Sequence, residues 1–274
     1  MHSRRWVLAA SYTVLVMGVL VVVGPFVWQA LTSVKSFQDS VRIPPTVLPS
    51  PWDWSGYAKV FELMPLGHQF VNTVLMAGGR TIAQLIFCSL AAFAFARLEF
   101  PGRRFFFGLF LVVLMVPSQL FVIPQFLIMQ KLGWLNTIQA LIVPGMFSAF
   151  GTFLLRQFFA GLPRELDEAA ELDGCGPLQR YWRILLPLSK PGLIALAVLT
   201  LLWSWNDLMW PLIVNTDPEM MPLSAGLAAL SGQHNIEYPA LMAGSLMATA
   251  PVIVIFAILQ KQIIEGIANT GGKA

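Results

Sequence analysis

Residues 163–188 read Pro-Arg-Glu-Leu-Asp-Glu-Ala-Ala-Glu-Leu-Asp-Gly-Cys-Gly-Pro-Leu-Gln-Arg-Tyr-Trp-Arg-Ile-Leu-Leu-Pro-Leu. Five carboxylates fall within nine residues: Glu165, Asp167, Glu168, Glu171 and Asp173. The stretch predicts a short helix, a glycine turn and a second helix. Pro163 and Pro177 suit helix starts, because the missing N–H would be unpaired there anyway. Gly174 and Gly176 suit a helix end, where the chain needs a positive φ.

The rest of the chain is mostly apolar. Of its 274 residues, 57% are hydrophobic and 11% are charged, whereas a soluble domain has about a quarter charged residues. The composition therefore indicates an integral membrane protein. The formal net charge of +3 implies no nucleic-acid partner. Two cysteines, Cys88 and Cys175, and three scattered histidines give neither a disulfide framework nor metal-site spacing, so we expect no metal.

Six apolar segments are long enough to cross a bilayer, which needs about 20 residues each. They lie near 6–31, 69–96, 105–130, 137–160, 191–214 and 239–261. We expect Pro117 and Pro124 to break the third segment locally. The first segment is too long for the apolar part of a signal peptide, so we interpret it as a retained membrane helix.

Lysine and arginine are unevenly distributed along these segments and their connections. With the N-terminus in the cytoplasm, twelve of them lie in cytoplasmic pieces and four in external pieces, and Arg80 lies within a segment. Cytoplasmic loops carry the excess of positive charge in membrane proteins. We therefore expect both termini, and the acidic 163–188 loop, in the cytoplasm.

The acidic stretch resembles the Glu-Ala-Ala (EAA) loop of importer-type ABC permeases. The family's pattern is Glu-Ala-Ala, three residues, Gly, nine residues, Ile, any residue and Leu-Pro. Here it falls without departure on Glu168, Ala169, Ala170, Gly174, Ile184, Leu186 and Pro187. Residues 91–103 and 115–137 resemble carbohydrate-type members. Residues 256–274 resemble the C-terminus of maltose-transporter-like second permeases, with a modest departure in the tail.

The resemblance implies an all-α membrane protein with six transmembrane helices, a type I ABC importer permease fold and both termini in the cytoplasm. Residues 1–67 would hold the first transmembrane helix and an external Pro- and Trp-rich loop. Residues 68–265 would form the transmembrane core with the coupling loop 163–188, and residues 266–274 a cytoplasmic C-terminal tail. The implied location is the bacterial inner membrane, which the chain would cross several times.

The resemblance also implies partners. These are a homologous second permease subunit, two ATP-binding subunits, an extracytoplasmic solute-binding protein and the lipid bilayer. The chain contains no Gly-x-x-x-x-Gly-Lys-Ser/Thr phosphate loop. We therefore expect a transport subunit that is not itself an enzyme and carries no cofactor, with ATP and Mg²⁺ bound by the partner ATPase subunits.

Two sets of residues are candidates for function on the cytoplasmic side and within the membrane. The candidates for ATPase coupling are Glu165, Glu168, Ala169, Ala170, Asp173, Gly174, Ile184 and Pro187. The candidates for the substrate pathway are Asn72, Arg80, Trp203, Asn206, Asp207 and Trp210. An ionisable residue within a span is costly and marks a functional site by default, although Arg80 could instead make a structural hydrogen bond to a neighbouring helix.

The last four pathway candidates are spaced i, i+3, i+4 and i+7, so a continuous helix would place them on one face. Aromatic rings beside hydrogen-bonding groups suit a sugar, whose ring has apolar C–H faces and a polar rim. An aromatic belt at the outer interface is the alternative. The belt accounts for the tryptophans but leaves Asn206 and Asp207 unexplained.

The external segment 215–238 contains no Lys or Arg. We expect a short helix from Leu223 to Leu230, followed by a turn-prone polar tip. The tip residues are Gly232, Gln233, His234 and Asn235. In the permeases that the chain resembles, the corresponding loop reaches into the binding protein, so these residues are candidates for receptor contact; the alternative is an ordinary connector.

The function favoured by these observations is a permease subunit that imports a sugar or sugar-derived solute. One alternative is a glycerol-phosphate-type importer permease, whose anion pathway would need cationic residues such as Arg80. An ion-coupled secondary transporter predicts several buried carboxylates and often inverted repeats, yet Asp207 is the one acid placed well within a span. A structural membrane protein would not need the EAA spacing.

Overall fold

The computed structural model describes residues 2–232 and 235–271. Across those ranges the regular structure is helical, and no strand occurs. The chain divides into two compact units. Unit 1 contains Met1–Gly67 and Gly226–Pro251, and unit 2 contains His68–Ala225 and Val252–Ala274.

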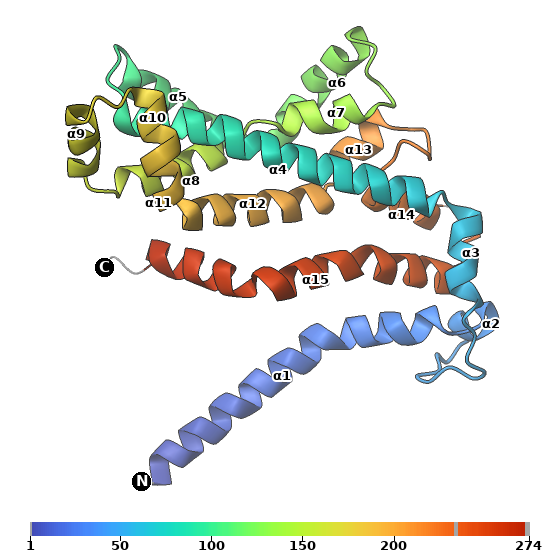
Figure 1. Cartoon of the computed structure of the whole chain (residues 1–274). Coiled ribbons are helices and arrows are strands. Elements are labelled where there is room, and N and C mark those ends of the chain that lie inside the picture. The colour runs from blue at the N-terminus through green and yellow to red at the C-terminus, as the bar shows by residue number, and fades with distance from the viewer. Residues whose placement is uncertain (1, 233–234, 272–274) are drawn as a thin grey trace. The chain divides into compact units, whose positions relative to one another are not determined.

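Figure 1 labels the α-helices along the chain. In chain order the elements are α1 (His2–Ser33), α2 (Phe37–Ser40), α3 (Ser55–Leu63), α4 (Leu66–Arg97), α5 (Arg103–Met115), η1 (Ser118–Phe121), α6 (Val122–Lys131), α7 (Ile138–Ile142), η2 (Val143–Gly145), α8 (Ala149–Ala160), α9 (Glu165–Leu172), α10 (Pro177–Arg180), η3 (Tyr181–Leu185), α11 (Leu186–Leu188), α12 (Lys190–Trp205), α13 (Met209–Val214), α14 (Leu223–Ser231) and α15 (Tyr238–Gly271). The segments η1 and η2 are 3₁₀-helical, and η3 is π-helical.

Three helices are long and apolar enough to cross a membrane on their own: Ser11–Ser33 of α1, all of α4, and Tyr238–Ile258 of α15. They match the predicted segments 6–31, 69–96 and 239–261. Three bent pairs also reach this length, and their bends are 97° between α5 and η1–α6, 43° between α7–η2 and α8, and 77° between α10–α11 and α12. The described part of the chain thus offers up to six spans if each bent pair counts as one.

The third predicted segment, 105–130, is broken where one of its two prolines lies. Helix α5 ends at Met115, and Pro117 precedes η1, so the expected break at Pro117 is confirmed. Pro124 was also expected to break the segment, which was wrong. It lies in the first turn of α6, where backbone N–H groups have no partner within the helix, so a missing N–H costs little.

The fifth predicted segment, 191–214, is also not one helix. Helix α12 ends at Trp205, Asn206 follows as its C-cap, and α13 begins at Met209. The Asn206 side-chain amide donates to the Leu202 carbonyl oxygen at 2.8 Å. Asparagine side chains compete with helix hydrogen bonds in this way, so the break lies at the two polar residues Asn206 and Asp207.

The acidic stretch forms the predicted helix, glycine turn and helix. Gly174 has φ +80° and ends the turn after α9, and Pro177 begins α10, as expected. Gly176 was expected at a positive φ, but it has φ −69° as the N-cap of α10. Helix α9 begins two residues after Pro163.

Unit 1 is held together by contacts around the short helix α3. The Ser33 and Tyr57 hydroxyl oxygens lie 3.0 Å apart, which joins α1 to α3. The Lys59 ammonium pairs with the Glu237 carboxylate at 2.6 Å. The predicted external segment 32–68 is irregular over its proline-rich part, but α3 is a regular nine-residue helix that sequence composition did not indicate.

Unit 2 is organised along α4, which contributes to two buried clusters. The first cluster contains Cys88, Ala92, Phe93, Leu155, Phe159, Tyr181, Leu185 and Leu196. The second contains Met76, Met129, Ala140, Leu141, Trp210 and Val214. Helices α9 and α10 lie beside the C-terminal end of α4, and α6, α7 and α13 lie toward its N-terminal half (Figure 1).

Candidate functional site

Arg80 and Asp207 form an ion pair inside unit 2. The Arg80 Nη1 atom lies 2.8 Å from Asp207 Oδ2, and the two side chains are 9% and 24% exposed. Arg80 comes from α4, and Asp207 comes from the break between α12 and α13. A buried charge that loses its partner is strongly destabilising, so the pairing explains how two ionisable residues are tolerated among apolar helices.

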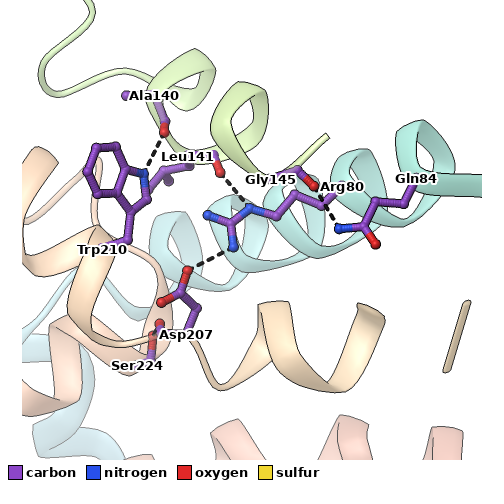
Figure 2. A network of polar contacts seen from close by, with 8 residues as sticks. All are labelled: Arg80, Gln84, Ala140, Leu141, Gly145, Asp207, Trp210 and Ser224. Atoms are coloured by element: carbon purple, nitrogen blue, oxygen red, sulfur yellow. Dashed lines mark hydrogen bonds and ion pairs between the residues drawn. The ribbon is translucent and has the colours of Figure 1, made fainter. Parts of the chain in front are cut away.

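Three side chains around this pair hold the broken segment formed by α7 and η2 (Figure 2). Arg80 Nε donates to the Leu141 carbonyl oxygen at 2.6 Å, and Gln84 Nε2 donates to Gly145 at 2.8 Å. Trp210 Nε1 donates to the Ala140 carbonyl oxygen at 2.8 Å. Non-helical backbone at membrane depth must have its polar groups satisfied by neighbouring elements, and these side chains do so.

Two open pockets share Arg80, Gly145 and Asp207 in their walls. One has a volume of about 230 Å³, and its other polar lining residues are Ser118, Gln119 and Gln125. The second has a volume of about 290 Å³ and is also lined by Gln84, Thr200, Trp203 and Ser204. The ion pair therefore lies where amide and hydroxyl groups could bind a polar solute.

The expected helical face of four pathway residues does not exist, because α12 stops before Asn206. Trp203 is 56% exposed on α12 and packs edge-on against Phe150. Trp210 is buried on α13 with its N–H already bonded to Ala140. The structure brings Arg80, Asp207 and Trp210 into one network and leaves Asn206 as a helix cap.

Asn72 lies elsewhere on α4 and has another role. Its side-chain amide donates to the carbonyl oxygens of Glu219 and Met221 at 2.7 and 3.1 Å. It thereby holds the loop that precedes α14. Asn72 is not among the residues that line either of the two pockets beside Arg80.

Helix α9 has an outward face and an inward face. Glu165, Glu168, Ala169 and Asp173 are exposed, whereas Ala170 is buried and Asp167 is largely covered. The first turn of α9 carries three carboxylates, which its positive N-terminal dipole favours. The exposed carboxylates and the thin Ala169 side chain are available to a partner.

The inward face is fixed by an ion-pair network that pattern reasoning missed. Arg97 Nη1 lies 2.9 Å from Asp167 Oδ2, and the two side chains are 6% and 14% exposed. The Arg180 guanidinium pairs with Glu171 and lies 4.0 Å from Asp167. The sequence carried one weak signal, since Arg97 ends an apolar run expected on the same side of the membrane as the acidic loop.

The second half of the loop is anchored on α4. The Tyr181 and Ser89 hydroxyl oxygens lie 2.6 Å apart in a buried position. Tyr181 and Leu185 belong to the first buried cluster, while Ile184 is half-buried and Pro187 is exposed in α11. The loop is therefore attached to the membrane domain along most of its length.

The external tip is described in part. The predicted short helix is present as α14, and Gly232 and Asn235 are exposed after it. Gln233 and His234, two of the predicted receptor contacts, lie outside the described residues. In the described ranges, no group of three or more His, Cys, Asp or Glu residues could hold a metal ion.

Comparison with known proteins gives consistent relatives. The chain is 38% identical over 204 residues to the arabinooligosaccharides transport system permease protein of Halalkalibacterium halodurans, covering 74% of this chain and 73% of that one. It is 31% identical over 271 residues to the diacetylchitobiose uptake system permease protein of Streptomyces coelicolor, covering 97% and 89%. It is also 31% identical over 281 residues to the sn-glycerol-3-phosphate transport system permease protein of Yersinia enterocolitica, covering 98% and 99%.

A solved structure and a family model agree with these relatives. The fold matches the crystal structure of a bacterial ABC transporter involved in the import of the acidic polysaccharide alginate, with a TM-score of 0.85, 24% identity and coverage of 95% of this chain and 98% of that chain. The family model described as "binding-protein-dependent transport system inner membrane component" matches residues 84–267. The resemblance inferred from the EAA loop and the inner-membrane location are thereby confirmed. The chain belongs to the family of inner membrane components of binding-protein-dependent transport systems.

Proposed function

We propose that this chain is a permease subunit of an ATP-driven importer and forms half of the pathway for a sugar or sugar-derived solute. The observation that carries the proposal is the two-faced helix α9, whose inward acids bind the membrane domain and whose outward acids are left for a partner. The names of two relatives, which refer to arabinooligosaccharides and diacetylchitobiose, support the solute class.

The proposed assembly contains more than this chain. A homologous second permease would complete the pathway, two ATP-binding subunits would dock at the coupling loop 163–188, and a solute-binding protein would dock outside. ATP and Mg²⁺ would bind to the ATPase subunits, so this chain would be a transport subunit without its own hydrolytic site. The tip from Gly232 to Asn235 is the proposed contact for the binding protein.

The proposed topology has six spans and both termini in the cytoplasm. Residues 1–67 would supply the first span and the external loop, residues 68–265 the core, and residues 266–274 a cytoplasmic tail. The three single helices and three bent pairs support this count. The excess of Lys and Arg on the α9 side supports the orientation.

The Arg80–Asp207 pair favours an uncharged solute. Each pocket beside the pair contains both a guanidinium and a carboxylate, so the net charge of the pair is close to zero. The other polar groups of the first pocket are the hydroxyl of Ser118 and the amides of Gln119 and Gln125, which suit sugar hydroxyls. A glycerol-phosphate solute, named for the Yersinia relative, would meet a cation whose charge Asp207 already offsets.

Coupling requires that the partner binds two conformations of the permease with different affinity. Shifting a pathway from mostly closed to mostly open needs about 5.5 kcal/mol of differential binding. Charge-assisted contacts are roughly twice as strong as neutral hydrogen bonds. The exposed Glu165 and Glu168 are therefore suitable contacts for a cationic surface on the ATPase.

The test combines purification with uptake. The tagged chain is purified from the membranes of its host, and co-purifying proteins are quantified. Cells with and without the chain are then given labelled arabino-oligosaccharide, diacetylchitobiose or glycerol 3-phosphate separately. A stoichiometric ATPase and loss of sugar uptake are expected. Absence of any ATPase would overturn the importer, and loss of glycerol 3-phosphate uptake alone would overturn the solute class.

A further inference from the structure

The C-terminal end of α4 is a junction between three helices. Arg97 is the last residue of α4, and its Nη2 atom donates to the carbonyl oxygens of Phe159 and Leu162, the latter at 2.7 Å. These two carbonyls lie at and just beyond the end of α8. The Nη1 atom pairs with Asp167 on α9 at 2.9 Å. One guanidinium thus binds α8, α9 and the residues between them to α4.

The junction is built from buried groups. The Arg97 side chain is 6% exposed and its carboxylate partner 14% exposed, so water screens the pair far less than a surface pair. The planar guanidinium distributes its donors in fixed directions, which gives the contact geometric precision. Separating α9 from α4 would therefore leave a charge buried without its partner.

The path from α9 to α12 along the chain is much less rigid. It passes through Gly174 at φ +80°, then through the π-helical segment η3, and then through a bend of 77° between α10–α11 and α12. In contrast, α4 runs without glycine or proline between Arg80 and Arg97. These 17 residues span about 25 Å at 1.5 Å per residue.

We propose that Arg97 and Asp167 join α9 to α4 as one moving body, so that motion of the coupling helix reaches the Arg80–Asp207 pair through α4 rather than through α12. Arg97 is then a positioning residue for coupling. The proposal rests on the proposed function in one respect, namely that α9 is the helix on which the ATPase acts. The Tyr181–Ser89 hydrogen bond adds a second attachment of the loop to α4.

The test measures distances within the intact complex containing the ATPase subunits. The background carries Cys88→Ser and keeps Cys175 as one spin-label site, because Cys175 N donates to Ala170 O at 2.8 Å and so follows α9. The second label is placed on α4 by Leu90→Cys or on α12 by Lys190→Cys, which are both exposed positions. Pulsed electron spin resonance then compares the nucleotide-free complex with the complex trapped by ATP and vanadate.

The proposal predicts that trapping leaves the distance from Cys175 to α4 within about 1–2 Å, the scale of a helix shift. The distance from Cys175 to α12 should change by more than that. A change in the α4 distance, with the α12 distance constant, would overturn the proposal. A complex in which both distances stay constant would overturn it as well, because α9 would then not move relative to α12.

Variants separate a joint from mere structural support. Asp167→Asn should broaden the distance distribution between Cys175 and α4, and Asp167→Glu should restore the narrow one. Glu171→Gln is the matched control on the same helix, because it removes the more exposed pair with Arg180 and should leave the distribution narrow. If Asp167→Asn does not assemble, Arg97→Lys retains the charge but loses the fixed fork, and should also broaden the distribution. An unchanged distribution in the assembled variants contradicts the joint.

The same experiment distinguishes this inference from the proposed function. Glu168→Lys should release the ATPase from the purified complex if α9 is its contact. Retention of the ATPase in that variant would weaken the proposed function. Retention of narrow distances in Asp167→Asn, with Glu168→Lys behaving as expected, would remove the joint alone.

Discussion

Arg80 donates from Nη1 to Asp207 and from Nε to the Leu141 carbonyl oxygen, so one side chain of α4 holds both an ion pair and a broken backbone segment (Figure 2). The two residues are 127 positions apart in the sequence. Their contact joins the middle of one helix to the break between two others. Removing either partner therefore affects two elements.

The first prediction concerns this pair. Asp207→Ala should destabilise the protein by about 3–5 kcal/mol, because Arg80 would remain buried without a counter-charge. The double variant Arg80→Met with Asp207→Leu should recover much of that loss, since both charges are then absent. Thermal unfolding in detergent, arranged as a double-mutant cycle, measures the coupling. Additive effects of the two single changes would contradict a direct pair.

The second prediction concerns the space beside Arg80. A Cβ added at Gly145 would lie 2.6 Å from the Arg80 Cδ and Nε atoms, so Gly145→Ala should displace the guanidinium and lower the melting temperature. Gly78→Ala is the control on the same helix as Arg80. Nothing lies within 4 Å of its added Cβ, and alanine should stabilise the helix by about 0.5–1 kcal/mol. Equal melting temperatures for the two variants would argue against the close packing.

The third prediction concerns the glycine turn. Gly174 has φ +80°, so Gly174→Ala should cost about 1–2 kcal/mol from backbone strain alone, since no atom lies within 4 Å of the new Cβ. Gly176→Ala is the matched control, because Gly176 has φ −69° and equal space. Thermal unfolding should separate the two variants. If both behave alike, the left-handed turn is not a constraint on stability.

The fourth prediction concerns the outward face of α9. Glu168→Lys should abolish co-purification of the ATPase and solute uptake while membrane insertion survives, because a cationic partner would be repelled. Glu171→Gln should leave both intact, since the Glu171 carboxylate is more than half exposed and contacts Arg180 within the chain. Normal uptake in Glu168→Lys would refute the assignment of that residue.

Much of the architecture followed from local pattern. The EAA spacing, the positive φ of Gly174 and the short helix from Leu223 are each encoded within a few residues, because they depend on side chains and dihedral angles close together in the chain. The apolar segments followed from length. Local pattern also located the two ionisable residues of the membrane site, Arg80 and Asp207, but not their contact.

The breaks and the pairings depended on distant residues. Hydropathy runs on through 191–214, so it could not reveal that Asn206 caps α12 and that Asp207 leaves the helix. Arg97 and Asp167 are 70 positions apart, beyond the reach of any helical period. Only the packing of α4 against α8 and α9 brings them together.

The segment from Ala140 to Gly145 accepts its three hydrogen bonds from Trp210, Arg80 and Gln84 through backbone oxygens. Every amino acid supplies the same carbonyl, whereas the donors need a particular nitrogen at a particular reach. Evolution of this site should therefore be lopsided. Ala140 and Leu141 can drift among apolar residues without breaking a bond, while each donor can change only together with the loop that it holds.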